Sequence, residues 1–148
     1  MKALAENKRA SFDYETLETY EAGLVLYGFE VKAIKTGHAG LKGSYVVLRN
    51  GEAYLVNAVI PPYQPLNTPE GYDPQRSRKL LLKKSEINCL IGKSKIKGLT
   101  LVPLRLYTKK YKIKLEFAIA KGKKKIDKRE KIKKRDIERE INRETRGR

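Results

Sequence analysis

The sequence predicts a mainly β fold, a small β-barrel with flanking helices followed by a basic C-terminal tail. Residues 111–120 alternate apolar and polar side chains, as a strand with one buried face does. Asn50-Gly51 lies between two runs rich in β-branched and aromatic residues, which is the strongest short-range signal for a hairpin. Residues 121–148 hold 14 basic and 6 acidic side chains and no aromatic residue, so this segment is too polar to form a core of its own.

The composition excludes several classes of protein. A chain of 148 residues fits one domain, and its 40% hydrophobic content is sufficient for a core. No apolar run approaches the ~20 residues of a membrane helix, and residues 1–11 lack the apolar stretch of a secretory signal, so we expect a cytoplasmic protein without membrane contact. One cysteine and one histidine exclude a disulfide framework and the common zinc sites, and we expect no metal or cofactor. The net charge of +17 favours a nucleic acid or another polyanion as partner.

The first half of the predicted body, residues 1–120, begins with a strand and a helix. Residues 12–20 are rich in aromatic and β-branched side chains and predict a strand. Residues 24–35 carry apolar side chains at helical spacing; an alternating pattern competes with it, and the helix is favoured. Residues 44–60 then form the hairpin, with a type I′ turn at Asn50-Gly51.

The second half of the body begins with a long loop. Residues 61–75 contain five of the six prolines, and a loop of this length is either functional or mobile. Residues 76–93 predict a helix of about four turns with one apolar face. Residues 99–107 and 111–120 predict a final pair of strands.

Pro103 lies within the first strand of that pair. Because proline lacks the N–H of a ladder donor, this strand is expected to be an edge strand or to be bulged there. Five or six strands with two helices favour a closed or partly closed barrel. For a basic protein of this size, an oligonucleotide-binding barrel is the natural candidate.

No constellation of side chains predicts an enzyme. His38 lies between two small residues in an expected turn, where a histidine is usually solvated. Cys89 falls beside Leu90 and Ile91 in the second predicted helix, where it would act as a small buried hydrophobe. The chain also lacks the glycine-rich phosphate loops of nucleotide-binding enzymes.

Basic side chains gather in groups that would neutralise phosphates. Lys8 and Arg9 precede the first strand, and Lys32 and Lys35 share the polar side of the first helix. Five more lie in the second predicted helix: Arg76, Arg78, Lys79, Lys83 and Lys84. Such groups set affinity and salt dependence without reading sequence. The nine tyrosines either offer stacking faces for unpaired bases or fill the barrel wall.

The tail carries two pairs of opposite charge at i,i+4 spacing, Asp127–Lys131 and Glu130–Lys134. Each pair stabilises a helix by only a few tenths of a kcal/mol, so we expect the free tail to be disordered. A polyanion would relieve its internal repulsion and allow a helix to form on binding. The alternative is a tail that binds polyanions without specificity.

Seven short stretches occur in a fixed order between about residues 7 and 135. They are residues 7–10, 17–23, 28–37, 41–57, 73–87, 98–107 and 120–130. Each is weakly specific alone, but together in this order they resemble the SsrA-binding protein family, the small protein B partners of transfer-messenger RNA.

The resemblance implies a fold and a function. The family's body is an oligonucleotide-binding barrel that binds the tRNA-like domain of transfer-messenger RNA and delivers it to ribosomes stalled on messages without a stop codon. The tail is implied to enter the vacant decoding centre and mRNA channel of the small subunit and to become helical there. Members are adaptors in trans-translation and not enzymes, and we expect a monomer off the ribosome.

The resemblance also implies site residues, carried over position by position. The RNA-binding set of the body is Asn7, Lys8, Arg9, Glu21, Gly23, Lys32, Lys35, Lys79 and Leu81. The ribosome-contacting set of the tail is Gly122, Lys123, Lys124, Asp127, Lys128 and Arg129. Ile126 stands where the family usually has an aromatic or imidazole ring, so only apolar contact is available there.

Two members of the body set leave alternatives open. Glu21 cannot attract phosphate; it could accept hydrogen bonds from base amino groups or a 2′-hydroxyl, or hold a neighbouring basic side chain. Leu81 fits an RNA contact and a core position equally well.

Two other functions remain open on the residues alone. A permanent ribosomal or general RNA-binding protein would associate with all ribosomes and not only with stalled ones. An RNA-processing enzyme built on a barrel would lose its activity when His38 and Cys89 are replaced together.

Overall fold

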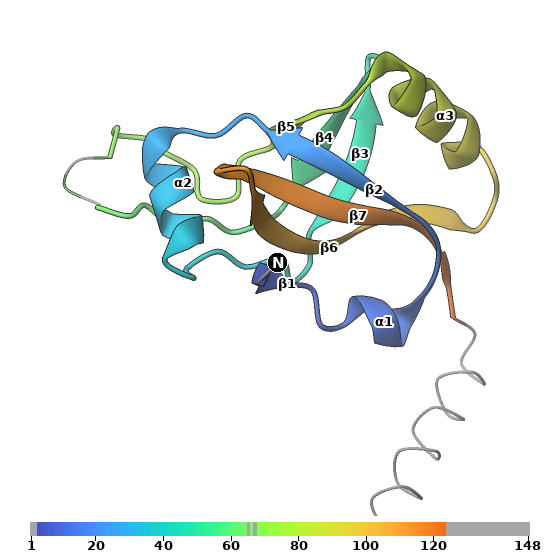
Figure 1. The fold of residues 1–148 in the computed structure, drawn as a ribbon, viewed down its shortest axis with the longest axis horizontal. Coiled ribbons are helices and arrows are strands. Elements are labelled where there is room, and N and C mark those ends of the chain that lie inside the picture. The colour runs from blue at the N-terminus through green and yellow to red at the C-terminus, as the bar shows by residue number, and fades with distance from the viewer. Residues whose placement is uncertain (1–2, 65, 67, 124–148) are drawn as a thin grey trace, which may run out of the picture.

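Seven antiparallel strands form one curved sheet with three helices around it in the computed structural model, which describes residues 3–64, 66 and 68–123 (Figure 1). The strands are β1 Ala3–Glu6, β2 Tyr14–Leu24, β3 Tyr45–Arg49, β4 Glu52–Val56, β5 Arg78–Leu81, β6 Leu99–Lys109 and β7 Lys112–Gly122. The helices are α1 Ala10–Asp13, α2 Gly28–Lys35 and α3 Lys84–Ser94. The mainly β prediction is therefore confirmed.

The sheet curls without closing completely in the described part of the chain. Its strand order is β1-β6-β7-β2-β5-β4-β3, so β1 and β3 are its two ends. The open edge of β3 faces β6 across a groove of about 320 Å³ that Val46, Leu48, Leu101 and Ile119 help to line. This arrangement matches the partly closed form of the predicted barrel.

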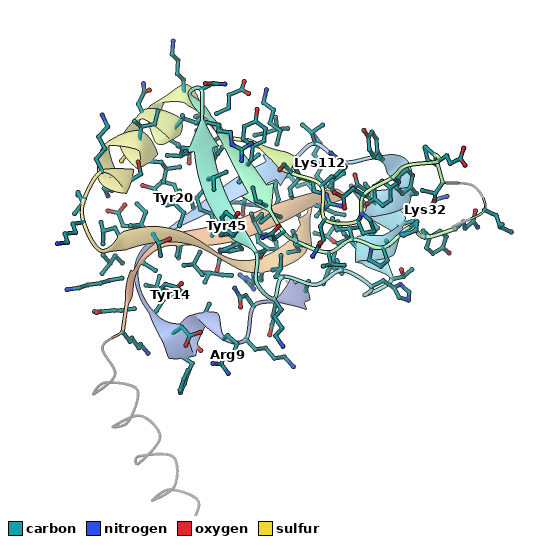
Figure 2. All side chains as sticks on the ribbon, turned by 180° about the vertical axis from the view of Figure 1, so that it is seen from behind. Arg9, Tyr14, Tyr20, Lys32, Tyr45 and Lys112 are labelled. Carbon is teal, nitrogen blue, oxygen red and sulfur yellow. The ribbon has the colours of Figure 1, made fainter. Side chains whose placement is uncertain are left out.

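The long strands β2 and β7 run side by side across the molecule. They pair antiparallel from Tyr14↔Gly122 to Gly23↔Lys114. Tyr14 consequently lies at one end of the molecule, and Lys112 lies toward the other end, where α2 packs (Figure 2). Two surfaces described below occupy these two ends.

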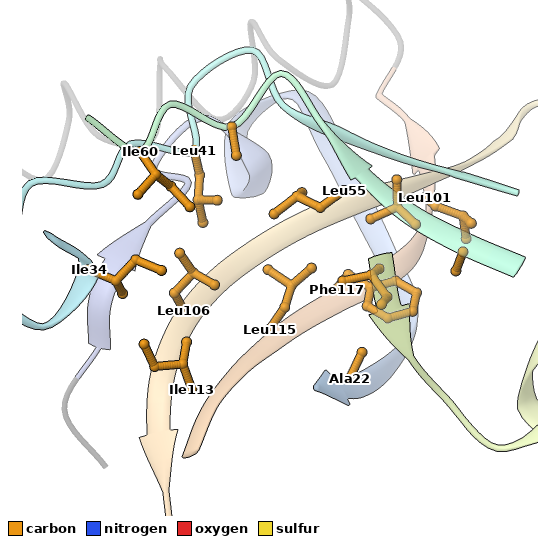
Figure 3. Packing of buried hydrophobic residues seen from close by; sticks show 14 of the residues in the cluster. Ala22, Ile34, Leu41, Leu55, Ile60, Leu101, Leu106, Ile113, Leu115 and Phe117 are labelled. Atoms are coloured by element: carbon orange, nitrogen blue, oxygen red, sulfur yellow. The ribbon is translucent and has the colours of Figure 1, made fainter. Parts of the chain in front are cut away.

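The core lies on the inner face of the curved sheet (Figure 3). In β7 the predicted alternation is confirmed, because Leu115 and Phe117 are fully buried while Lys112 is exposed and Lys114 is half-buried. Tyr111 was expected on the buried face of this strand. That prediction is wrong: Tyr111 precedes the strand, in the turn from β6, and is 94% exposed.

The first hairpin forms as predicted. Asn50 and Gly51 have φ angles of 50° and 75°, which are the positive values that a type I′ turn requires. The predicted first helix is confirmed only from Gly28 onward, because Leu24 still belongs to β2 and pairs with Leu80.

The predicted helix over residues 76–93 is wrong in its first part. Arg78–Leu81 forms β5, which is inserted between β2 and β4. The helix begins at Lys84, where the Glu86 side chain accepts a hydrogen bond of 3.0 Å from the Lys83 backbone N–H. Pairing with two strands distant in sequence outweighs the helical spacing of the leucines.

The N-terminal part of the chain also differs from expectation. β1 was not predicted, and α1 takes the first residues of the segment expected to be a strand. The bulge expected at Pro103 is confirmed by a shift of register between Pro103 and Arg105. No helix among the described residues is long and apolar enough to span a membrane.

Candidate nucleic-acid interface

Four of the nine RNA-binding residues expected in the body meet on the outer surface of β2, β5 and β7. Glu21 and Gly23 come from β2, and Lys79 and Leu81 come from β5. With Lys114 of β7 they line a hollow of about 520 Å³, which we call the β2–β5–β7 groove. A second hollow of about 300 Å³ continues it past Leu81 and Lys114 toward the β6–β7 turn.

Glu21 is held by its neighbours within this groove. Its carboxylate accepts hydrogen bonds from the Tyr107 hydroxyl and from Lys109 Nζ, the latter at 3.3 Å. The Tyr107 hydrogen bond lowers the pKa of Glu21 against the effect of burial, and Lys109 and Lys114 lower it further. Glu21 therefore stays ionised at neutral pH and fixes a basic side chain, which was one of the two roles expected for it.

Leu81 and Leu80 show how β5 divides its side chains. Leu80 is 2% exposed and belongs to the core, whereas Leu81 is 54% exposed on the groove. The open choice between core and surface for Leu81 is thus decided in favour of the surface. A Cβ built on Gly23 would lie 3.4 Å from Leu81 Cβ, so a larger residue at this position would fill part of the groove.

The N-terminal residues form a separate surface at the other end of β7. Asn7 is tied to the fold: its Nδ2 donates a hydrogen bond of 2.9 Å to the Pro103 carbonyl. Lys8 and Arg9 are exposed, and Arg9 lies 3.7 Å from the Asp13 carboxylate. Lys123 joins this surface because its Nζ donates a hydrogen bond of 2.7 Å to the Ser11 carbonyl.

Lys32 and Lys35 lie on the exposed side of α2, beyond the far end of the groove. Lys32 Nζ is 6.0 Å from the centre of the Tyr63 ring. The three groups of predicted RNA-binding residues are therefore distributed over the groove, the N-terminal surface and α2, and not gathered at one point.

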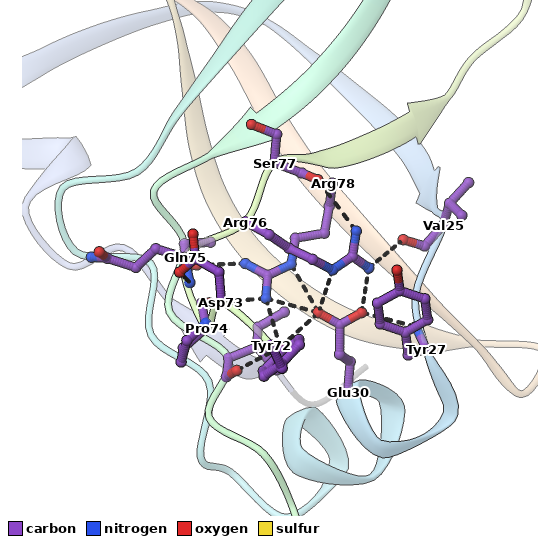
Figure 4. A network of polar contacts seen from close by, with 12 residues as sticks. Val25, Tyr27, Glu30, Tyr72, Asp73, Pro74, Gln75, Arg76, Ser77 and Arg78 are labelled. Carbon is purple, nitrogen blue, oxygen red and sulfur yellow. Dashed lines mark hydrogen bonds and ion pairs between the residues drawn. The ribbon is translucent and has the colours of Figure 1, made fainter. Parts of the chain in front are cut away.

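A buried polar network anchors α2 to the loop before β5 (Figure 4). Glu30 and Arg78 are both fully buried, and the Glu30 carboxylate accepts hydrogen bonds of 3.0 and 2.8 Å from Arg78 Nε and Nη2. Arg76 binds the same carboxylate and stacks on the Tyr27 ring at 4.3 Å, and the Tyr72 hydroxyl donates a further bond of 2.8 Å.

This network corrects the expectation that Arg76 and Arg78 neutralise phosphates from a helix. Arg78 is inaccessible to RNA, and Arg76 is largely engaged by Glu30. Burial raises the pKa of Glu30, but hydrogen bonds from Arg76, the Tyr27 N–H and Arg78 outweigh it and hold the pKa below its ordinary value. The network serves to position α2 and its two lysines.

Comparison with known proteins places the chain in a family. The family model described as SmpB protein matches residues 4–147. The chain belongs to the SmpB family. An SsrA-binding protein of Sulfurihydrogenibium sp. is 53% identical over 146 residues, which cover 99% of this chain and 95% of the relative. One from Geobacillus kaustophilus is 52% identical over 147 residues, 99% of this chain and 94% of the relative.

A solved structure is also similar. A chain described as "tmRNA-SmpB: a journey to the center of the bacterial ribosome" is 47% identical, with a TM-score of 0.67. The match covers 81% of this chain and 84% of that one. Fold and family therefore agree with the resemblance found in the sequence.

The structure adds basic residues that sequence reasoning did not select. Lys109, Lys112 and Lys114 all lie at or beside the β2–β5–β7 groove. The outward positions of Lys112 and Lys114 in the alternating strand were a usable signal, but no local pattern showed that β5 would lie beside them. Of the tail set, Gly122 ends β7, and Lys124, Asp127, Lys128 and Arg129 lie outside the described residues.

The two residues considered for catalysis are both exposed. Cys89 was expected to be buried and is not; its Sγ lies 3.7 Å from the Tyr20 hydroxyl. His38 Nδ1 lies 2.7 Å from Thr36 Oγ1. Residues 3–64, 66 and 68–123 contain no group of three or more His, Cys, Asp or Glu side chains placed to hold a metal ion.

Proposed function

We propose that the chain is an RNA-binding adaptor for trans-translation, which binds the tRNA-like domain of transfer-messenger RNA and carries it to stalled ribosomes in the cytoplasm. The observation that carries this proposal is the 47% identity to a solved SmpB chain described together with tmRNA and the ribosome. The adaptor is not an enzyme, because its family works by binding RNA.

The β2–β5–β7 groove is proposed as the main RNA contact. Lys112 and Lys114 can neutralise phosphates around the groove and the hollow that continues it, and Lys79 can do so by exchanging its exposed partner Glu52, 2.9 Å away, for a phosphate. The apolar side chain of Leu81 offers a surface for a base or sugar. Lys8 and Arg9 at the N-terminal surface, with Lys32 and Lys35 on α2, would add contacts to the backbone of a larger RNA.

The tail that follows β7 and the anchored Lys123, residues 124–148, is proposed as the ribosome-contacting part. Its charge suits ribosomal RNA, and Lys124, Asp127, Lys128 and Arg129 are the residues proposed to act in the decoding centre and mRNA channel. Since Lys123 is anchored beside α1, the tail starts from the N-terminal surface and away from the groove.

Competition binding over a salt series tests the RNA assignment. The purified chain is titrated with the tRNA-like domain, with a tRNA and with an unrelated structured RNA. Non-specific binding weakens together for all three RNAs as salt rises. A preference for the tRNA-like domain that persists at high salt supports the proposal, and equal, steep loss for all three RNAs contradicts it.

A pair of matched variants tests the groove itself. Replacing Lys79 and Lys114 with alanine should remove two phosphate contacts. The slope of log K against log salt concentration should then become shallower by about two. Replacing Lys95 and Lys97 with alanine removes the same amount of charge just after α3 and should change the salt slope less. Equal slopes for the two double variants would place the RNA elsewhere on the surface.

Truncation separates the two proposed parts. Deleting residues 124–148 leaves every described strand intact, so binding to the tRNA-like domain should persist while tagging of stalled nascent chains is lost. Loss of RNA binding in the truncated chain would contradict the division of roles.

A further inference from the structure

The turn between β6 and β7 carries an unusual residue at its tip. Lys109 and Lys112 are the last paired residues, so Lys110 and Tyr111 form a two-residue turn. Their φ angles are 50° and 66°. Turns of this type favour Asn-Gly, as the chain itself has at Asn50-Gly51, because bulky side chains are disfavoured at positive φ. The tyrosine therefore strains the backbone without being required by the turn.

The ring of Tyr111 contributes little to the fold. It is 94% exposed, whereas Tyr107, four residues earlier, is 2% exposed in the barrel wall. Among the described residues, the aromatic and cation–π contacts involve other aromatic rings and not that of Tyr111. A strained, exposed aromatic side chain is a cost to the folded protein, and such costs concentrate at functional positions.

The residues around Tyr111 form a hollow that suits a ligand with an aromatic ring and a negative charge. Tyr111 lines the hollow of about 300 Å³ that it shares with Gly23, Leu81, Lys112 and Lys114. Within this hollow an aromatic face lies near an apolar side chain and two cations. Aromatic faces beside a basic groove bind unpaired nucleobases by stacking, while the cations bind the adjoining phosphates.

We propose that Tyr111 stacks on an unpaired base of the RNA bound in the β2–β5–β7 groove. The inference rests on the proposed RNA-binding function and adds an aromatic base contact beside Leu81 and the lysines of the groove. The stacking role also explains why an aromatic residue occupies position 111, where the positive φ angle favours glycine. The phenol oxygen is not needed, so the ring alone carries the contact.

Substitution of Tyr111 tests this proposal by affinity. Tyr111→Gly suits the backbone of the turn, so the variant should fold at least as stably as the parent while binding the tRNA-like domain about tenfold more weakly. Tyr111→Phe keeps the ring and should bind as the parent does. Neither change removes a charge, so the salt slope should stay the same in both variants, unlike that of Lys112→Ala.

Fluorescence gives a readout that a purely structural role would not change. The chain contains no tryptophan, so Tyr111→Trp would introduce a single one. Stacking on a base should quench its emission, with a saturation curve that matches the binding constant. Ile96→Trp, at an exposed position after α3, should show no such quenching and serves as the matched control.

The outcomes separate this inference from the proposed function. If the parent chain prefers the tRNA-like domain at high salt but Tyr111→Gly binds equally well, or if the tryptophan at position 111 is not quenched, the stacking inference is wrong and the proposed function stands. If the parent chain shows no preference, the proposed function fails, and the stacking inference fails with it.

Discussion

Replacing Glu30 with alanine should destabilise the fold by about 3–5 kcal/mol, the usual cost of breaking a buried ion pair by removing one partner. Glu30 and Arg78 both have fully buried side chains, and their closest approach is 2.8 Å. Without the carboxylate, the Arg78 guanidinium would keep its charge in the protein interior with only backbone carbonyls and the Tyr72 hydroxyl as partners. A typical domain has only about 5–15 kcal/mol of stability in total, so the loss is large.

The pH dependence of stability provides a second expectation for Glu30. Its pKa in the folded protein is lower than the ordinary value of 4.5. The ionised group therefore contributes stability that is fully present above about pH 4.5 and is lost as the pH falls through the folded pKa. Glu30→Gln does not titrate, so its stability should fall less steeply over this acid range than that of the parent.

Urea denaturation at pH 7 and at a series of lower pH values measures both effects. Glu52→Ala is the matched control, because Glu52 forms an ion pair of 2.9 Å with Lys79 in which both side chains are more than 40% exposed. That pair should contribute less than about 1 kcal/mol. If Glu30→Ala does not fold, Tyr72→Phe removes one hydrogen bond to the same carboxylate and should cost about 1 kcal/mol.

The reasoning would be refuted if Glu30→Ala lost no more stability than Glu52→Ala. The same holds if parent and Glu30→Gln lost stability in parallel on acidification. The network would then be a set of contacts without net effect on the fold, and α2 would need another anchor.

Three further predictions concern residues at the groove and in the first hairpin. Leu80→Ala should lower the free energy of unfolding by about 2–5 kcal/mol in urea titration, because the Leu80 side chain is buried. Leu81→Ala should lower it by less than about 1 kcal/mol and should instead weaken RNA binding, measured by RNA titration. Gly51→Ala should cost about 1 kcal/mol or more, measured by thermal unfolding, because alanine is strained at a φ of 75°. Glu21→Ala should cost about 1–3 kcal/mol in urea by leaving the buried Tyr107 hydroxyl without its acceptor, and adding Tyr107→Phe should recover part of that loss.

These three predictions have clear contrary results. Equal stability losses for the two leucine variants would mean that β5 does not divide its faces as described. An unchanged melting temperature for Gly51→Ala would argue against the type I′ turn. Strictly additive losses for the Glu21 and Tyr107 variants would show that the two groups do not interact.

Sequence patterns predicted the elements whose signals are local. The alternation in β7 and the Asn50-Gly51 turn depend on neighbouring residues, and both were found as predicted. The strand β5 was missed because the leucines near it also fit a helical period. Its strand form depends on pairing with β2 and β4, which lie far away in the chain, and local periodicity contains no information about such partners.

The sequence selected some of the residues that line the candidate site but did not predict how they are arranged. Family resemblance selected Glu21, Gly23 and Leu81, which the fold then brings to one groove. Counting charges could not distinguish Arg78, which is buried against Glu30, from Lys79, which faces outward one residue later. That distinction follows from the two faces of β5, so the misassigned strand also led to the misassigned arginine.

The strand β7 connects the turn that carries Tyr111 with the N-terminal surface where Lys123 is anchored. One end meets the turn that carries Tyr111, and the other ends at Gly122, directly before the anchored Lys123. Eleven residues of extended chain correspond to roughly 35 Å. β7 is hydrogen-bonded on both sides, to β6 and β2, and this pairing restricts bending of the strand. In the proposed function, β7 would therefore set the distance between RNA bound in the β2–β5–β7 groove and the point where the C-terminal tail begins.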